Sequence, residues 1–145
     1  MMSRALRVLL VEDDENDAEL ALRALSKAGV PGMVAHAHDG EEALDFLLGR
    51  GAFQGCPGAE GLRVILLDLK LPKLDGLEVL RTIRAEPITR DIPVVMLTSS
   101  MLPSDVGACY RAGASSYVVK QVEFAAHARA LQEIAAYWLR LNVVP

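Results

Sequence analysis

Five short apolar runs recur along this chain, and each is followed by a segment in which apolar residues have helical spacing. The first run, Leu6 to Val11, is nearly continuous in Leu and Val, which is typical of a central parallel strand covered on both faces. The segment after it places Ala18, Leu22 and Leu25 on one helical face. It ends at Gly29, a residue type that commonly terminates helices. This alternation favours a sheet of mostly parallel strands with helices packed against it.

The remaining segments repeat the order of strand and helix. We expect strands at 33–37, 63–68, 92–100 and 115–120, and helices at 39–49, 77–86, 103–112 and 123–141. The pairs Asp39-Gly40 and Asp75-Gly76 are predicted to be turns that start helices, without a chemical role. Five strand-helix pairs predict one α/β domain, with right-handed crossovers and helices on both faces of the sheet. The length of 145 residues suits a single domain spanning 1–145.

Composition narrows the class of protein. Hydrophobic residues make up 52% of the chain and charged residues 23%, as in globular proteins. The net charge of -4 argues against a nucleic-acid-binding surface, which needs a basic patch. No stretch approaches about 18 uninterrupted apolar residues and no basic leader precedes an apolar segment, so we expect a cytoplasmic protein without a membrane segment. Cys56 and Cys109 lie far apart, and we expect two free thiols.

Polar residues suited to chemistry follow four of the predicted strands. In open α/β sheets, ligands bind beyond the carboxyl ends of the strands, where the strand order reverses. The residues at those positions are Glu12, Asp13, Asp14, Asp68, Thr98 and Lys120. An ionised carboxylate at the end of a buried strand is costly unless a cation meets it. The sequence therefore predicts that these side chains converge on one crevice.

Clustered carboxylates repel one another, so a divalent cation is the natural partner of this set. Mg²⁺ prefers oxygen ligands in near-octahedral geometry and retains several waters. A lysine amine and a threonine hydroxyl beside such a metal are suited to holding phosphoryl oxygens. We therefore expect a phosphoryl-transfer site in which Asp68 is the central carboxylate and the candidate nucleophile.

Taken singly, each of these residues has a simpler interpretation. The carboxylates from Glu12 to Asp14 are favoured near the start of any helix, because the helix dipole is positive there. Thr98 could be an ordinary strand-end hydroxyl and Lys120 a solvated lysine. Tyr117, which lies three residues before Lys120, could be a half-buried strand aromatic. The combination, rather than any one residue, favours the site.

The three histidines receive no role in this site. His36 and His38 alternate on one predicted strand and so share a face, which would suit a metal. No third ligand accompanies them in the sequence, and ordinary packed or surface histidines are the simpler interpretation. His127 falls on the last predicted helix, where we expect it to be exposed. None is a convincing phosphodonor, so the donor is expected to be another protein.

The motifs of this chain have the order and spacing found in receiver domains of two-component response regulators. They are LVEDDE, DGEEAL, LLDLKLPKLDGLEVL, IPVVMLTSS and AGASSYVVK. Over about residues 6–141, the chain resembles that family. The resemblance implies the flavodoxin-like (βα)5 fold, with five parallel strands in the order 2-1-3-4-5 and helices on both faces. It also implies a signalling protein rather than an enzyme, one that catalyses only its own phosphotransfer and slow autodephosphorylation.

The resemblance assigns roles to the residues of the crevice. It implies that Asp68 accepts a phosphoryl group from a phosphohistidine of a histidine kinase. Glu12 and Asp13 would bind Mg²⁺ together with Asp68 and the backbone carbonyl of Lys70. The metal would offset the negative charges that meet during in-line transfer.

Three further residues would respond to the phosphoryl group. Thr98 and Lys120 would contact its oxygens once the aspartyl phosphate forms. Tyr117 has the position of the family's switch aromatic, three residues before the lysine. Movement of the threonine toward the phosphoryl group would free space for the tyrosine ring, so that phosphorylation shifts an equilibrium between two surface shapes.

Two features depart from the common receiver pattern. Many receivers have a proline joined by a cis peptide after the lysine, whereas Gln121 follows Lys120 here, which leaves the geometry of that loop open. The glycine-rich stretch 49–63 is longer than usual for a helix-to-strand connection. Both features resemble the single-domain regulators that partner bacterial and cyanobacterial phytochrome kinases, so a phytochrome-type histidine kinase is the expected partner.

The end of the chain is unusually apolar. A helical stripe is expected to face the sheet, formed by Phe124, Ala128, Leu131, Ala135, Trp138 and Leu141. Four more apolar residues lie outside or beyond it, namely Tyr137, Leu139, Val143 and Val144. The tail either folds back onto its own domain or, over about residues 137–145, packs against a second copy in a homodimer. Because no output domain follows Pro145, we expect the signal to leave through binding, or by draining phosphate from a kinase.

Three functions compete for this pattern. The leading one is a stand-alone response regulator that is phosphorylated on Asp68. The alternative is a phosphorylation-independent dimeric interaction module of the same fold, although the full set of site residues argues against it. A hydrolase with an aspartyl-phosphate intermediate would place a second aspartate where Lys70 stands. A flavin-binding protein of similar topology would need a phosphate loop after the first strand, where the acidic EDDEND stands instead.

Overall fold

The computed structural model describes residues 6–29 and 33–145. Five parallel strands form one sheet in the order β2-β1-β3-β4-β5, as predicted. The strands are β1 (Val8–Val11), β2 (Val34–Ala37), β3 (Val64–Leu67), β4 (Val94–Thr98) and β5 (Ser116–Val119). The helices are α1 (Glu15–Lys27), α2 (Gly40–Leu48), the short 3-10 helix η1 (Gly51–Phe53), α3 (Gly76–Ala85), α4 (Pro103–Arg111), α5 (Phe124–Ala136) and its π-helical continuation η2 (Tyr137–Leu141).

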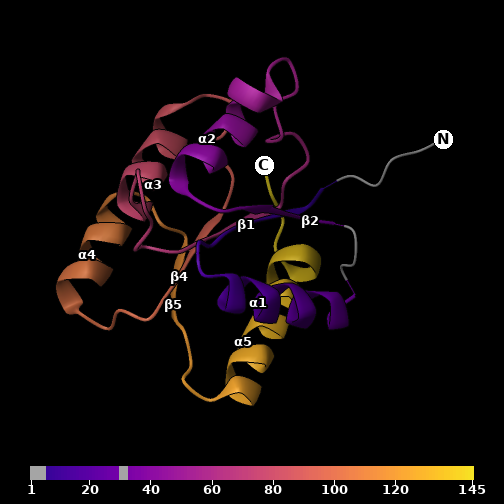
Figure 1. Ribbon diagram of the computed structural model, residues 1–145, viewed down its shortest axis with the longest axis vertical. Coiled ribbons are helices and arrows are strands. Elements are labelled where there is room, and N and C mark those ends of the chain that lie inside the picture. Colours follow the sequence, from indigo (N-terminus) through magenta and orange to yellow (C-terminus); the bar gives the residue numbers. More distant parts are fainter. Residues whose placement is uncertain (1–5, 30–32) are drawn as a thin grey trace.

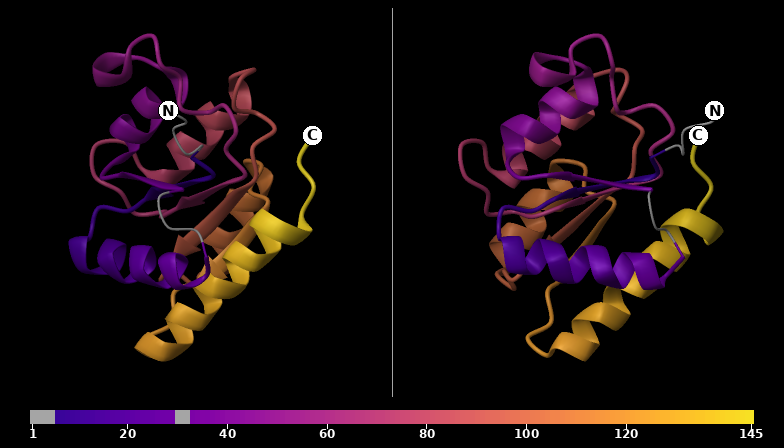
Figure 2. Two further views of the ribbon diagram at one scale, coloured as in Figure 1. Left: turned by 90° about the vertical axis from the view of Figure 1, so that its right-hand side faces the viewer. Right: turned by 45° about the vertical axis from the view of Figure 1, so that its right-hand side comes forward.

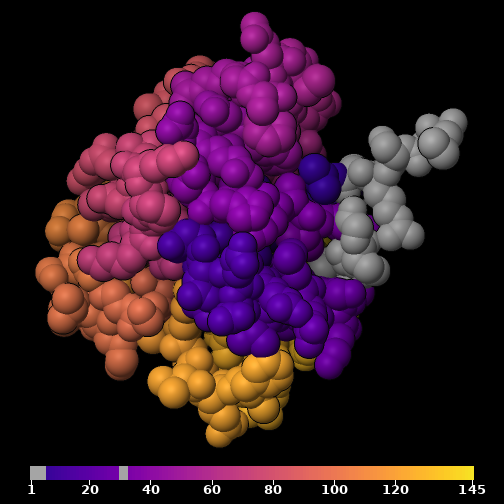
Figure 3. Space-filling view, viewed as in Figure 1, coloured from indigo at the N-terminus to yellow at the C-terminus, as the bar shows by residue number. Residues whose placement is uncertain are grey.

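Two layers of helices enclose the sheet (Figures 1 and 2). Side chains alternate between the faces of a strand, so Leu9 and Val11 pack in the core beneath α2, α3 and α4. Val8 and Leu10 pack in the core beneath α1 and α5. Figure 3 shows α1, in indigo, directly beside the start of α5, in yellow. The central strands β1, β3 and β4 are fully buried, which explains their uninterrupted apolar sequences, while the edge strands β2 and β5 are mostly half-buried.

Three of the helices begin at an aspartate that follows a strand or its loop. Asp14, Asp39 and Asp75 are the N-cap residues of α1, α2 and α3. Each carboxylate accepts a hydrogen bond from the backbone N–H three residues later, at 2.9, 2.7 and 3.1 Å respectively. Such caps satisfy N–H groups that the helix leaves without partners. The predicted helix starts at Asp39-Gly40 and Asp75-Gly76 are therefore confirmed.

Close packing at Gly76 fixes the loop that follows β3. A Cβ atom at this position would overlap the backbone carbonyl oxygen of Asp68. The N–H of Gly76 also donates to the carbonyl of Leu69 at 2.9 Å. Because glycine lacks a Cβ atom, the start of α3 can lie directly against the strand end that carries Asp68.

Helix α5 covers the sheet with only part of the predicted stripe. The stripe residues that pack against the core are Ala128, Leu131, Ala135 and Trp138. Phe124 and Leu141 were expected to pack there too, but they are 59% and 72% exposed. The helix and its continuation together extend roughly 25 Å, whereas strands of four or five residues extend roughly 13–17 Å. Both ends of the helix therefore project beyond the sheet, as Figure 2 shows.

The expectation that His127 is exposed is wrong. The residue is only 8% exposed, because the buried face of α5 includes His127 and Ile134. Its Nδ1 atom accepts a hydrogen bond from the backbone N–H of Gln121 at 3.4 Å. Proline has no N–H, so this contact depends on the departure from the common receiver pattern noted above. The loop after Lys120, whose geometry the sequence left open, is thus bound to α5 and contains no cis peptide bond.

The chain after η2 turns toward the amino ends of the strands. Val143 is 88% exposed, whereas Val144 is half-buried. Val144 and Pro145 line a cavity of about 240 Å³ together with residues 59–62, 87–88 and 91–93. The last two residues thus lie against their own domain, while Tyr137, Leu141 and Val143 remain exposed. The tail therefore folds back onto its own domain in part. Its exposed apolar side chains are compatible with the other interpretation, packing against a second copy.

The long stretch 49–63 is ordered by packing on α2. Phe53 in η1 contacts Phe46 in an edge-to-face arrangement, with 5.5 Å between the ring centroids. Farther along, Ala59 and Leu62 enter the core. Cys56 is exposed, Cys109 is buried, and both are free thiols as expected. None of the helices in residues 6–29 and 33–145 is long and apolar enough to cross a membrane.

Candidate functional site

Backbone hydrogen bonds between neighbouring strands bring the predicted site residues to one edge of the sheet. The N–H of Asp68 donates to the carbonyl of Val11 at 3.2 Å, which places Asp68 beside Glu12. On the other side, the N–H of Lys120 donates to the carbonyl of Thr98 at 2.8 Å. The strand order then sets the two pairs next to each other, because β3 pairs with β4. The predicted convergence is therefore confirmed for Glu12, Asp13, Asp68 and Lys120, and Thr98 ends the neighbouring strand. The Asp14 carboxylate instead caps α1.

Three carboxylates form the centre of the site. Ligand oxygens of Glu12, Asp13 and Asp68 lie within 4.8 Å of one another. Glu12 and Asp68 are only 4% and 8% exposed, whereas Asp13 faces solvent. Burial raises the pKa of Glu12 to about 7, and the charge of Asp68 adds to the effect, against the lowering by hydrogen bonds from Lys120 and the Asp14 N–H. Crowded oxygen donors of this kind suit a hard divalent cation such as Mg²⁺.

Lys120 supplies the positive charge that meets these carboxylates. Its Nζ atom lies 2.6 Å from Glu12 Oε1, 3.2 Å from Asp68 Oδ2 and 3.1 Å from Asp17 Oδ2. Burial alone would lower the pKa of this lysine, but the hydrogen bond to Glu12 and the charges of Asp68 and Glu12 outweigh it. The pKa is therefore held above its usual value. The ammonium group is the link among carboxylates that come from two strand ends and one helix.

Asp17 is a member of this group that the sequence reasoning did not identify. It lies in the first turn of α1, and its N–H is the donor to the Asp14 cap. The available signal was its position three residues after the capping residue, on a helix that starts beside the site. Its carboxylate contacts Lys120 but is not among the three clustered carboxylates described above.

Two other predicted residues lie in the loop after β3 and at the end of β4. The backbone N–H of Lys70 donates to Asp68 Oδ1 at 3.3 Å, so the chain after β3 folds back over the carboxylate. Thr98 is 1% exposed at the end of β4, and its Oγ1 accepts a hydrogen bond from the N–H of Ser100 at 3.3 Å. The threonine hydroxyl is thereby connected to the loop between β4 and α4.

Tyr117 reaches the same loop from β5. Its hydroxyl donates to the backbone carbonyl of Ser100 at 2.9 Å, and burial raises the pKa of the phenol. The Ser100 hydroxyl in turn donates to Asp105 Oδ2 at 2.5 Å. Thr98 and Tyr117 therefore bind the same residue of the loop, one through its N–H and the other through its carbonyl. Asp105 was not predicted, because its role depends on how α4 sits against the loop.

His36 in β2 and His38 just after it lie beside the site rather than in it. Their ring centroids are 4.1 Å apart. The Nε2 atom of His36 bonds to the backbone carbonyl of Glu12 at 2.8 Å, and Nδ1 of His38 bonds to Glu42 at 3.2 Å. His36 thus supports the chain at the first strand end.

Comparison with known proteins identifies the family. The family model described as the response regulator receiver domain matches residues 8–132. The probable methanogenesis regulatory protein FilR2 of Methanothrix harundinacea is 40% identical over 95% of this chain and 86% of its own length. Response regulator Rcp1 of Synechocystis is 35% identical over 95% of this chain and 92% of its own.

Solved structures agree with this result. The phosphorylated cyanobacterial phytochrome response regulator RcpA has a TM-score of 0.89 and 33% identity, covering 98% of this chain and 99% of its own. The Mn²⁺-bound form of Rcp1 has a TM-score of 0.87 and 34% identity over 97% and 99%. The bacteriophytochrome response regulator AtBRR is 47% identical over 97% and 100%, with a TM-score of 0.73. With its strand order, its clustered carboxylates and these matches, the chain belongs to the response regulator receiver domain family.

Proposed function

We propose that this chain is a single receiver domain, spanning 1–145, that accepts a phosphoryl group on Asp68 from a histidine kinase in a Mg²⁺-dependent reaction. The observation that carries the proposal is the contact of Lys120 with both Asp68 and Glu12 at the end of a buried sheet. A lysine held there can neutralise a carboxylate before transfer and a phosphoryl group after it. As in other receivers, the chain would act in signalling and would catalyse no reaction beyond its own phosphorylation and dephosphorylation.

The proposed transfer forms a bond between an oxygen of Asp68 and phosphorus. The P–N bond of the phosphohistidine breaks, and its electron pair stays on the imidazole nitrogen of the donor. Asp68 is held for this reaction by the N–H of Lys70 and by Lys120. A bound Mg²⁺, held by Glu12, Asp13, Asp68 and the Lys70 carbonyl, would offset the charge of the carboxylate and the donor phosphate.

The same proposal gives Thr98 and Tyr117 the role of a switch. The threonine would turn toward the new phosphoryl oxygens together with Lys120. Because Thr98 and Tyr117 both bind Ser100, a movement of the threonine hydroxyl would shift the loop that holds the tyrosine hydroxyl. This coupling supports a change in the surface formed by α4 and β5 when Asp68 is phosphorylated.

A phytochrome-type histidine kinase is the proposed partner, because RcpA and AtBRR are phytochrome and bacteriophytochrome response regulators. We also propose a homodimer formed through the C-terminal helix and its neighbouring surface. The exposed apolar side chains of Tyr137, Leu141 and Val143 support this assembly, since a monomer gains nothing from exposing them. The output would then pass through protein contacts rather than through catalysis.

Intact-mass spectrometry after incubation with acetyl phosphate tests the central step. The native chain should gain one phosphoryl group when Mg²⁺ is present and none when it is removed. Asp68→Asn should gain none, whereas Asp91→Asn, which changes an exposed aspartate outside the site, should behave as the native chain. Size-exclusion chromatography of the same samples measures the dimer. If the folded native chain gained no phosphoryl group, the phosphorylation-independent dimeric module would be the better explanation.

A further inference from the structure

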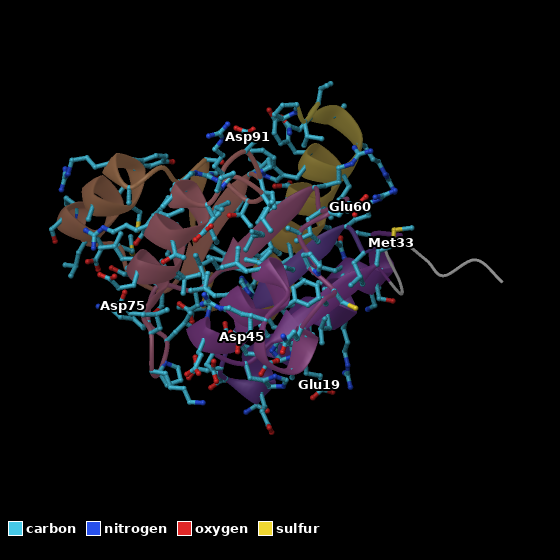
Figure 4. The ribbon with its side chains drawn as sticks, turned by 90° about the horizontal axis from the view of Figure 1, so that it is seen from above. Glu19, Met33, Asp45, Glu60, Asp75 and Asp91 are labelled. Carbon is cyan, nitrogen blue, oxygen red and sulfur yellow. The ribbon has the colours of Figure 1, made fainter. Side chains whose placement is uncertain are left out.

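A second charged cavity lies at the opposite edge of the sheet. It has a volume of about 240 Å³ and is lined by Arg7, Gly29, Met33, Arg63, Leu139 and Arg140. In Figure 4, the label of Met33 marks this region, across the molecule from Asp75 in the loop after β3. We call it the arginine cavity. None of its lining residues belongs to the site around Asp68.

The parallel sheet brings two of the arginines together. Arg7 and Arg63 directly precede β1 and β3, which pair in register from their first residues. The N–H of Arg63 donates to the carbonyl of Arg7 at 2.7 Å, and the N–H of Arg7 donates to the carbonyl of Met33 at 2.8 Å. These three residues therefore lie side by side at the amino ends of their strands.

The third arginine comes from the end of the chain. Arg140 lies in η2, and its Nη2 atom donates to the carbonyl of Ala28 at 3.1 Å, just after α1. Leu139 belongs to the same turn and packs against the core with Met33. The cavity thus has cationic groups from three separate segments and an apolar wall formed by a leucine and a methionine.

Contacts with the described residues use only a small part of the donors that these arginines offer. A guanidinium group has five N–H donors. Arg140 uses one on Ala28, and Arg7 uses one on the carbonyl of Gly61 at 3.0 Å. Across residues 6–29 and 33–145, the Arg63 side chain makes no hydrogen bond and no ion pair. The described residues thus leave most of these donors for other partners.

No described carboxylate forms an ion pair with the arginines of this cavity. In the part of the chain that the structure describes, no carboxylate oxygen lies within 4.0 Å of these three guanidinium groups. The remaining segments, 1–5 and 30–32, contain no aspartate or glutamate. A chain whose net charge is -4 therefore gathers three cations around one cavity that no described carboxylate lines. This arrangement favours an anion from outside.

We propose that the arginine cavity binds a small phosphomonoester. A phosphate group carries nearly two negative charges at neutral pH, which suits three cations better than the single charge of a carboxylate. The planar guanidinium fork matches phosphate oxygens in pairs. The organic part of the ligand would lie against Met33 and Leu139. This site is separate from the proposed phosphorylation of Asp68 and stands or falls independently of it.

A nuclear magnetic resonance titration of the full chain with phenyl phosphate, in buffer freed of metal ions, tests the proposal. The amide signals of Gly29, Arg63 and Leu139 should shift and saturate, while those of Asp13 and Lys70 should stay in place. Arg63→Gln should weaken binding about tenfold or more, because charge-assisted hydrogen bonds are lost. Its spectrum without ligand should otherwise match that of the native chain, since the Arg63 side chain makes no hydrogen bond or ion pair with the described residues.

Matched controls separate the chemical classes. Arg129→Gln removes the same charge from an exposed position on α5 and should leave the affinity unchanged. Benzoate should bind much more weakly than phenyl phosphate; equal binding would replace the phosphate assignment with a carboxylate site. Inorganic phosphate binding as tightly as phenyl phosphate would overturn the role of the apolar wall. The absence of saturable shifts, or equal affinity in Arg63→Gln, would overturn the whole proposal.

Discussion

Charged side chains at one end of the sheet are paired with each other, whereas those at the other end are not. At the carboxyl ends of the strands, Glu12 and Asp68 are buried and share the ammonium group of Lys120. At the amino ends, Arg7 and Arg63 lie beside each other with no carboxylate close to either in the described residues. Both groups arise from the same rule, since parallel strands in register place residues at equivalent positions side by side.

The difference lies in access to solvent. A buried charge must be compensated inside the protein, because removing it from water costs several kcal/mol. Around a surface cavity, water and salt screen like charges, so an imbalance can persist at small cost. We call the site around Asp68 the carboxyl edge and the arginine cavity the amino edge. The loss of one charge is therefore expected to change the free energy of unfolding strongly at the carboxyl edge and only weakly at the amino edge. The following predictions test this contrast, beginning with the largest effect.

Replacing Lys120 should produce the largest loss of stability. Lys120→Met keeps much of the side-chain volume but leaves Glu12 and Asp68 buried without a cation. Without metal, the free energy of unfolding should fall by about 3 kcal/mol, as for other buried pairs that lose one partner. Urea denaturation of the native and variant chains measures this change.

A second variant identifies the cause of that loss. Glu12→Gln removes a carboxylate from the same group, so the double variant Glu12→Gln/Lys120→Met should be more stable than Lys120→Met alone. Lys27→Met, at the exposed end of α1, should change the stability by less than about 0.5 kcal/mol. If Lys120→Met were as stable as Lys27→Met, the carboxyl edge would not depend on internal compensation.

The positions of the site residues could be predicted from sequence because strand ends obey a simple rule. Glu12, Asp68, Thr98 and Lys120 each follow an apolar run, and parallel pairing makes such residues neighbours. The same rule applied to Arg7 and Arg63 would have predicted the amino edge as well. Because parallel sheets bind ligands at their carboxyl ends, the amino ends carried no expectation of a site.

Features that depend on the rotation or reach of a helix were not predicted correctly. The apolar stripe of α5 was predicted to include Phe124, yet the buried residue at the start of this helix is His127. Spacing along a helix gives the relative positions of side chains, but tertiary packing decides which turns lie over the sheet. Asp17 and Arg140 were missed for the same reason, because each reaches its partners from a helix packed across another segment.

Replacing Gly76 should give the second largest loss of stability. Gly76→Ala places a methyl group against the Asp68 carbonyl. The strain should lower the free energy of unfolding by about 1–3 kcal/mol and should slow phosphorylation by moving Asp68. Gly107→Ala, inside α4, would meet only the flexible end of Arg111. That control should be neutral or stabilising by up to about 1 kcal/mol. Equal effects of the two substitutions in thermal denaturation would show that the close approach is not limiting.

His127 should make stability near the carboxyl edge depend on pH. Burial, together with the charge of Lys120, lowers the pKa of this histidine below its ordinary value of 6.5. Between the lowered pKa and 6.5 the unfolded chain binds more protons, so stability rises with pH. The stabilisation is complete above 6.5 and is lost as the pH falls below it, by at most about 1.4 kcal/mol per pH unit.

The comparison of native chain and His127→Gln isolates this contribution. Between pH 7.5 and 5.5, the native chain should lose more stability than the variant when both are unfolded by urea. Introducing Lys120→Met should reduce the difference, because the nearby positive charge is one cause of the lowered pKa. Parallel stability curves for native chain and variant would contradict the assignment of a neutral buried histidine.

Replacing Arg63 should change the stability least, and it should raise the stability rather than lower it. Arg63→Gln removes one of three like charges from a cavity that no described acid lines, which reduces their repulsion. At low salt the free energy of unfolding should therefore rise by about 0.3 kcal/mol. At about 1 M salt, where the screening length is only about 3 Å, the gain should vanish. Arg129 does not line this cavity, so Arg129→Gln should show no such salt dependence. A loss of stability in Arg63→Gln at low salt would mean that the amino edge also balances its charges, and the contrast between the two edges would fail.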